Sequence, residues 1–444
     1  MRTHLICGQL FTGLEEIANS DQTVVFDDDR ITYVGPSSTA PERRPGDEVV
    51  DYSHDFVLPG LIDIHVHLSY GNAQANEDID MYATPEFRSL RAMHAAQQVL
   101  KAGYTSIADP ASTGYTSVAV RDAVNAGMFP GPRITTSGRQ LTSRQGLGDW
   151  YPSWIGAPES SIGVLVHSTE EAVEEIRLQV KNRVDLIKFT ADGLNRSPDG
   201  ELMACFNQSE VNAIVEESHR LGRKVISHSR GREAVLQCAK AGVDIIFHAF
   251  EMDDEGLEAV IQSGAVLSQA LTFLVNTTEF TRPSDPCYRW RPNMNRRDID
   301  GACESLNKAH KAGVPFMVGT DSGFAITPYG EWHARELEIM VEYLGFTPGE
   351  ALKSTTSVNS ELLRDHEQVG RLAPGSFADI TVVSADPIKD ISVLQNRENI
   401  KDVYLSGSKV DLTPNEDPQT YQWEHSYRQW NDIYTRDRVA ELAQ

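Results

Sequence analysis

Short apolar runs alternate with longer amphipathic stretches between residues 61 and 321. Apolar runs of this length are typical of buried strands, and a helical periodicity in the stretches between them predicts helices. Eight runs occur, at residues 61–68, 105–109, 133–138, 185–191, 224–229, 244–250, 265–271 and 315–321. Strands that alternate with helices indicate a parallel sheet.

The intervening helices support a closed arrangement of these strands. They are expected at residues 86–101, 169–183, 209–221, 232–241 and 298–311, and several segments stop at a glycine before the next strand: Gly103, Gly222, Gly242, Gly264 and Gly313. Glycine closes a helix in the left-handed conformation at low steric cost. Eight such units over about 260 residues match an α/β fold of the (β/α)8 TIM-barrel type. A doubly wound open sheet is the alternative, but no glycine-rich dinucleotide loop follows the first strand.

The two flanks differ from this central region. Residues 1–56 and 359–412 contain short β-rich segments bounded by Gly, Pro and Asp. Neither flank is long enough for its own core, so we expect both termini to form one small β-sandwich beside a barrel of residues 57–358. We expect the tail, residues 413–444, to be helical, and to pack either on a neighbouring subunit or as a simple surface helix.

Composition narrows the range of partners. The 444 residues contain 40 Lys and Arg against 64 Asp and Glu, a formal charge of -24, which disfavours nucleic acid and anionic membrane surfaces. No apolar run reaches the roughly 20 residues of a membrane span. The five cysteines are scattered, and the first residues show no secretory pattern. We therefore expect a cytoplasmic protein with a small-molecule substrate and no nucleic-acid or membrane partner.

Candidate chemistry lies at the ends of the apolar runs, where a barrel enzyme builds its site. His65 and His67 are two residues apart on a strand, so both imidazoles face one side, although an isolated pair of this kind is weak evidence. Lys188 lies among apolar residues. It is either an ion-pair partner of Asp185 or Asp192, or a desolvated amine that takes up carbon dioxide and bridges two cations.

Three further runs end in residues that can bind metal: His228, His248 and Asp321. Taken singly, the histidines could be core residues and Asp321 a helix cap. Five different strands with such residues at one rim favour a metal centre.

The motifs LPGLIDIHVHL, GTDSG and LAPGSFADITVV, together with these strand-end residues, resemble the amidohydrolase superfamily. Within it, the chain is similar to the branch of Xaa-Pro dipeptidases, ochratoxinase-type amidases and imidazolonepropionase-like hydrolases, over about residues 5–412. The resemblance implies a TIM barrel with a β-sandwich from both termini. It also implies a binuclear centre, because mononuclear deaminase branches lack the bridging lysine.

The resemblance assigns six ligands to two divalent ions, with zinc expected by default and manganese or cobalt as substitutes. His65, His67 and Asp321 are assigned to the more buried ion, His228 and His248 to the more exposed one, and Lys188, N6-carboxylated, to both. Asp109 matches an acid of this branch, and we expect a structural role for it.

The sequence departs from the family pattern at positions where substrate contacts are expected. Leu147 stands where dipeptidase and ochratoxinase relatives carry a histidine, and Tyr329 stands in place of the histidine of a Pro-His-Gly motif. An Arg-rich segment between the last two strands offers Arg289, Trp290 and Arg291 as further substrate contacts. Trp150, Trp154 and Phe273 are aromatic candidates for the walls of a pocket.

These expectations combine into one function. We expect a homo-oligomeric zinc-dependent hydrolase that cleaves a C–N bond of an amide or peptide-like substrate, including an N-acyl amino acid or aryl amide, with metal-bound hydroxide. Asp321 is the expected catalytic acid and base. A carbamate or phenylurea hydrolase and a lactone or cyclic-amide hydrolase with the same metals are alternatives. A non-catalytic scaffold is disfavoured because all six ligand positions are filled.

Overall fold

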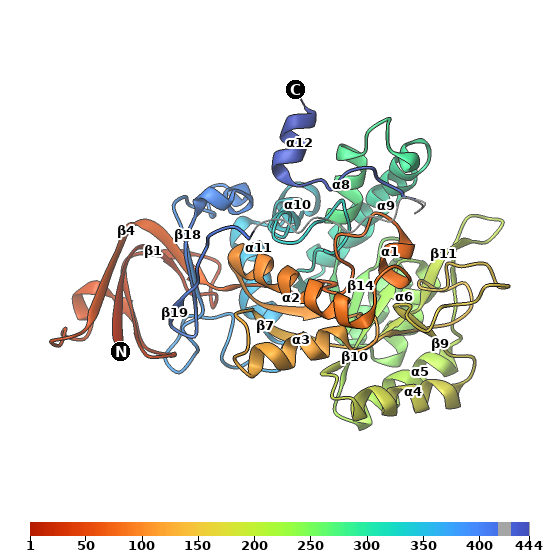
Figure 1. Cartoon of the computed structure of the whole chain (residues 1–444), viewed down its shortest axis with the longest axis horizontal. Coiled ribbons are helices and arrows are strands. Elements are labelled where there is room, and N and C mark those ends of the chain that lie inside the picture. Colours follow the sequence, from red (N-terminus) through yellow and green to blue (C-terminus); the bar gives the residue numbers. More distant parts are fainter. Residues whose placement is uncertain (416–427, 444) are drawn as a thin grey trace.

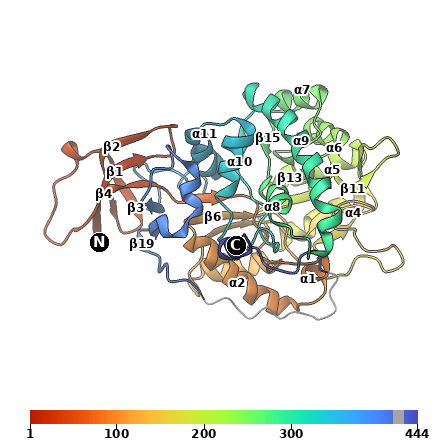
Figure 2. The same cartoon turned by 90° about the horizontal axis from the view of Figure 1, so that it is seen from above.

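The structure, a computed structural model that describes residues 1–415 and 428–443, places a sheet from both termini beside a barrel (Figure 1). In both views the C-terminal helix α12 (Arg436–Leu442) lies on the barrel and not on the sheet (Figure 1, Figure 2). Within the described part of the chain, no helix is both long and apolar enough to cross a membrane.

The predicted barrel is confirmed, and each of the eight predicted runs contains a parallel strand. The strands are β5 (Leu61–Asp63), β6 (Tyr104–Asp109), β7 (Arg133–Thr136), β10 (Leu186–Thr190), β13 (Lys224–Ser229), β14 (Ile245–His248), β15 (Val266–Ser268) and β16 (Phe316–Met317). The last strand returns to the first, because Ile64 N donates to Val318 O at 3.1 Å and Val66 pairs in parallel with Ser322. The ring is therefore closed.

Some strands were not expected from the sequence. The third barrel strand is bent: β7 pairs with β6, whereas β8 (Gln140–Thr142), only four residues later, pairs with β10 and with β9 (Gly163–Leu165). A hairpin of β11 (Asp192–Arg196) and β12 (Leu202–Ala204) follows β10. These elements have three to five residues, too few for a periodic pattern.

Helices lie between the strands around the barrel, as predicted (Figure 1). They are α2 (Pro85–Lys101), α3 (Thr116–Asn125), α4 (Thr169–Lys181), α5 (Gln208–Arg220), α6 (Arg232–Ala241), α7 (Asp254–Ser263), α9 (Arg291–Lys311) and α10 (Arg335–Leu344), with the shorter α1 (Asn76–Asp80), α8 (Thr272–Phe280) and α11 (Pro348–Lys353). Gly242 and Gly264 close α6 and α7 in the left-handed conformation, at φ 80° and 73°. The helix α9 starts at residue 291, seven residues before the predicted start.

Both termini form the second unit, a mixed seven-stranded sheet with the order β19-β18-β17-β4-β1-β2-β3. Its strands are β1 (Arg2–Phe11), β2 (Ala18–Asp27), β3 (Arg30–Pro36), β4 (Glu48–Pro59), β17 (Ile380–Val383), β18 (Ile400–Leu405) and β19 (Ser408–Lys409). The central β4 pairs in parallel with β1 and antiparallel with β17, so neither flank forms this sheet alone. Buried side chains from both flanks share one core, among them Leu5, Phe26 and Ile380.

Residues 428–435, the described part of the tail before α12, run across the barrel. Gln429 N donates to Gln74 O and Tyr434 N to Ala325 O, each at 2.8 Å, and the side chains of Trp430 and Tyr434 are buried. Of the predicted tail helix, only α12 is helical among the described residues; residues 428–435 are not helical, because their backbone bonds go to barrel loops. The remainder of that prediction, residues 416–427, lies outside the described residues.

A buried ion pair joins the two units, and its removal is expected to destabilise the protein. Asp379, next to β17, accepts hydrogen bonds from Arg133 Nε of β7 at 2.8 Å and from Ser406 N at 2.7 Å. Asp379→Ala leaves Arg133 without this partner and should lower the free energy of unfolding by about 3 kcal/mol in urea denaturation. Glu304→Ala, which removes an exposed partner of Lys308, is the control and should change nothing measurable. Equal midpoints for both variants would contradict the bridging role.

Candidate metal centre

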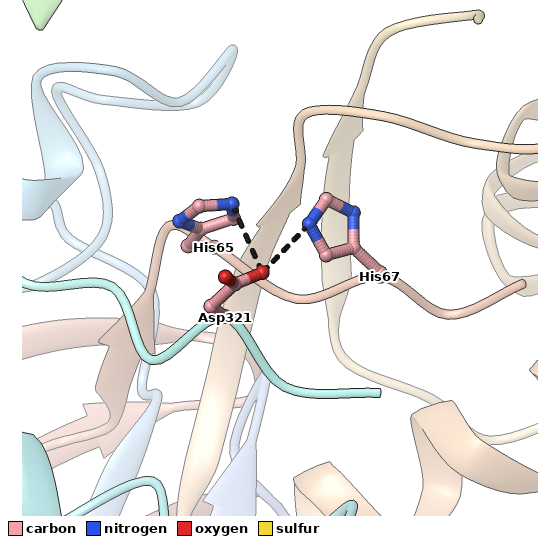
Figure 3. Close-up of side chains that lie close together, drawn as sticks. All are labelled: His65, His67 and Asp321. Atoms are coloured by element: carbon pink, nitrogen blue, oxygen red, sulfur yellow. Dashed lines mark ion pairs between the residues drawn. The ribbon is translucent and has the colours of Figure 1, made fainter. Parts of the chain in front are cut away.

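Three of the predicted ligands meet where the barrel closes. His65 and His67 follow β5, and Asp321 follows β16. Asp321 Oδ1 lies 3.0 Å from His67 Nε2 and 3.4 Å from His65 Nε2 (Figure 3). Their ligand atoms all lie within 4.8 Å of one another, a spacing that one metal ion could bridge.

The other three predicted ligands lie beside this group. The rings of His228 and His248 are 4.4 Å apart between centroids, and His248 is 5.7 Å from His65. Lys188 Nζ lies 4.1 Å from the centre of the Phe247 ring, which stacks on His65. All six side chains therefore lie at one end of the barrel.

Several buried polar atoms of this group have no hydrogen-bond partner. They are Lys188 Nζ, both ring nitrogens of His248, His228 Nε2 and His65 Nδ1. An unpartnered buried polar atom costs free energy, and such atoms are few in folded proteins. Their concentration here fits a bound cation.

The structure shows no ion pair between Lys188 and either aspartate that the sequence analysis considered as its partner. Asp185 pairs with Arg121 at 2.7 Å, and one oxygen of Asp192 accepts from the backbone N–H groups of Arg230 and Gly231. No ion pair with Lys188 occurs among the described residues. The lysine is a desolvated amine and not an ion-pair partner.

Burial sets the protonation of the group. It lowers the pKa of Lys188 to about 7 and that of His248 to about 3, and it lowers the pKa values of His65 and His228 well below the ordinary value. Burial alone would raise the pKa of Asp321, but the hydrogen bond from His67 and nearby positive charge lower it. Neutral imidazoles and a carboxylate are the forms that bind metal.

Backbone conformation at the ligands is unusual. His248 and Asp321 have φ values of 80° and 58°, in the left-handed region that non-glycine residues rarely adopt. Gly319 allows the last strand to approach the first, because a Cβ there would lie 2.5 Å from His65 Cβ. Strain of this kind concentrates at functional sites, where the surrounding structure enforces it.

A hydrogen bond from outside the group orients one of the histidines, His67. His67 Nδ1 donates to Ala111 O at 2.9 Å, and Nε2 of the same ring faces Asp321 Oδ1 at 3.0 Å. His228 Nε2 lies 3.5 Å from Asp192 Oδ1 but makes no hydrogen bond with it. A hydrogen-bond partner such as Ala111 O fixes the tautomer of a ligating histidine.

A buried polar network that the sequence analysis missed connects the first and last strands. Asp63 accepts from His65 N at 2.9 Å, from Thr320 Oγ1 at 2.5 Å and from His333 Nδ1 at 2.7 Å. His333 Nε2 in turn accepts from Gly330 N at 2.9 Å. The available signal was the charged Asp63 inside an otherwise apolar run.

The predicted substrate residues fall into different surroundings. Tyr329 Oη donates to His67 O at 2.6 Å and accepts from Gly71 N at 2.9 Å, so this hydroxyl holds the ligand segment. Leu147 is half-buried, and its backbone oxygen accepts a hydrogen bond from Thr190 Oγ1 of β10 at 3.2 Å. Arg289 and Trp290 are exposed, whereas Arg291 lies among aromatic rings.

The remaining candidates are separate from the ligands. Asp109 accepts from Leu68 N at 3.0 Å and Ala111 N at 3.3 Å, which orders the segments on either side of His67. Trp150 donates to Asp80, and Trp154 is 85% exposed, so neither forms a wall of the metal group in this structure.

A model of the amidohydrolase family matches residues 56–410, which include the whole ligand set. The chain belongs to this family.

The similarity to individual proteins is consistent with this family membership. The chain is 28% identical to an ochratoxinase from Aspergillus niger over 406 residues, which cover 86% of this chain and 82% of that protein. It is 22% identical to an imidazolonepropionase from Idiomarina loihiensis, over 88% of this chain and 92% of the relative. Among solved structures, a Xaa-Pro dipeptidase with bound methionine in the active site matches with a TM-score of 0.80 and 26% identity, covering 93% of this chain and 100% of the other.

Asp63 offers a test of the network beneath the ligands. Asp63→Asn keeps the shape but weakens the acceptor of the hydrogen bonds from His65 N and Thr320, so the ligands on both strands lose their support. We expect metal affinity to fall about 10- to 100-fold in a chelator competition assay. Asp55→Asn, in the terminal sheet, should leave metal affinity unchanged. Equal affinities in all three proteins would show that Asp63 does not position the ligands.

Proposed function

We propose that this protein is a two-metal hydrolase that cleaves a C–N bond in amide substrates. The observation that carries the proposal is the set of six ligand-type side chains at one rim, with several buried atoms that no protein group satisfies. Zinc is the ion that best suits nitrogen and oxygen ligands without a redox role.

The ligands divide between two ions as the family resemblance implies. His65, His67 and Asp321 would hold one ion, and His228 and His248 the other. Lys188 would bind both after its neutral amine adds to carbon dioxide, which forms a carbamate and releases one proton. Burial supports this step, because an amine with a pKa of about 7 is substantially neutral at neutral pH.

The chain itself supplies proton transfer and orientation. When bound, the two ions would lower the pKa of a water molecule and polarise the scissile carbonyl group. Asp321 accepts the proton of that water and delivers it to the leaving nitrogen. His67, fixed by Ala111, holds the Asp321 carboxylate in place.

The substrate is proposed to be an N-acyl amino acid, a peptide-like amide or an aryl amide. The similarity to a Xaa-Pro dipeptidase supports an amide substrate, because a dipeptidase cleaves a peptide bond. A homo-oligomer in the cytoplasm stays our prediction, to be checked by light scattering and cell fractionation.

The role of Lys188 is tested by metal analysis. We expect about two divalent ions per wild-type chain and fewer than about one in Lys188→Ala, because the shared ligand is lost. Bicarbonate should promote reconstitution of the wild type only. Lys181→Ala, at the exposed end of α4, is the matched control and should retain both ions. An unchanged metal content and activity in Lys188→Ala would rule out the bridging carbamate.

Asp321 is tested with the best substrate from a library of N-acyl amino acids, dipeptides and anilides. Asp321→Asn keeps an oxygen ligand but removes the base, so kcat should fall by about 10²- to 10⁴-fold. Metal content is measured in the same samples to separate lost ligation from lost proton transfer. A variant that keeps both its metal and most of its kcat would exclude Asp321 as the proton carrier.

A further inference from the structure

Arg291 is a half-buried cation without an acidic partner among the described residues. Its guanidinium carbon lies 5.1 Å from the ring centres of Phe273 and Trp430 and 5.4 Å from that of Trp290. Nη1 donates to the amide oxygen of Gln429, while Nε is buried and makes no hydrogen bond. No carboxylate in the described ranges forms an ion pair with it.

This position is unfavourable for a positive charge. Arg291 is the first residue of the 21-residue helix α9, where the helix dipole disfavours cations. Burial lowers its pKa to about 10, and the nearby Arg230 adds to that effect. Contacts with three aromatic faces stabilise the cation but leave its charge uncompensated. A bound anion next to Arg291 would compensate this charge.

Aromatic contacts connect Arg291 with the metal group. Phe273 lies 4.9 Å from Phe324 between ring centres, Phe324 lies 5.1 Å from Tyr70, and Tyr70 stacks on His67 at 4.3 Å. The charge of Arg291 also interacts with that of Asp321. The arginine therefore belongs to the same end of the barrel as the ligands.

The C-terminal segment holds Arg291 in place. Gln429 is fixed by its backbone, which donates to Gln74 O at 2.8 Å and accepts from Cys287 N at 3.2 Å. Trp430 is 1% exposed, donates from Nε1 to Thr281 Oγ1 at 3.3 Å and packs edge-on against Phe273. A neutral amide and an indole, instead of an acid, thus orient the guanidinium and preserve its charge.

We propose that Gln429 and Trp430 position Arg291 as the anchor for a free carboxylate of the amide substrate. The inference rests on the proposed function and deepens it, because it selects amides of amino acids over neutral amides. Arg291 would contact the substrate directly, whereas Gln429 and Trp430 are positioning residues. A guanidinium matches the planar geometry of a carboxylate.

The test compares the binding of two ligands that differ only at the carboxylate. N-tosyl-L-phenylalanine and the corresponding alcohol, N-tosyl-L-phenylalaninol, contain no amide bond, so their binding to the metal-loaded, full-length protein reports recognition alone. Calorimetry should show that Arg291→Met weakens binding of the free acid about 10- to 100-fold and that of the alcohol less than about threefold. Arg291→Lys should restore part of the affinity. Lys311→Met, which removes a charge at the exposed far end of α9, is the control.

Gln429→Glu provides a second, sharper variant. It supplies the acidic partner that Arg291 lacks, so the preference for the free acid should disappear while metal content stays at the wild-type level. In kinetics with matched acid and carboxamide substrates, KM for the acid should rise more than kcat falls. Equal losses for both ligands, or an unchanged preference in both Arg291→Met and Gln429→Glu, would overturn the proposal. Failure of the proposed function would show differently, as a wild-type protein without metal or without amide hydrolysis.

Discussion

Closure of the barrel between its first and last strands is the constraint on which the candidate centre depends. His67 and Asp321 are far apart in sequence, and the contact between their side chains exists only because β5 and β16 are neighbours. The hydrogen bond from Ile64 to Val318 sets their relative register. Inside the barrel, the Asp63 carboxylate accepts hydrogen bonds from the segments that follow both strands. The closure that forms the fold therefore also sets the distances between the candidate ligands.

Much of the fold could be predicted from the sequence because two signals were strong. Buried parallel strands appear as apolar runs, and the glycines after the helices mark where each helix ends. The bend between β7 and β8 left no signal, since only three residues separate two strands that pair with different neighbours. The course of the tail could not be predicted from the sequence either. Trp430 and Tyr434 were expected in a helix, and they are buried only because they contact loops that are distant in the sequence.

The candidate site likewise contains some residues that the sequence pattern indicates and others that it does not. The candidate ligand residues could be picked out because each stands near the end of an apolar run, where a polar side chain is conspicuous, and the structure brings these residues together; their metal binding stays a prediction. Asp63 and His333, which support the candidate ligands through hydrogen bonds, carry no spacing signal, because they act through contacts across the ring. Tyr329 illustrates the limit: its position next to the last strand suggested a substrate contact, and its hydroxyl is used to hold the backbone of His67.

The two parts of the site also follow different structural rules. Metal ligands need distances fixed within tenths of an ångström, and rigid strand ends supply them. Substrate selection needs side chains that can change without disturbing those distances, and loops serve this purpose. The C-terminal segment extends this separation, because Gln429 and Trp430 contact Arg291 and the outer loops but hold none of the six ligand residues. In this chain a net charge of -24 does not prevent a half-buried cation, Arg291, from packing on aromatic rings that lead to the candidate ligands.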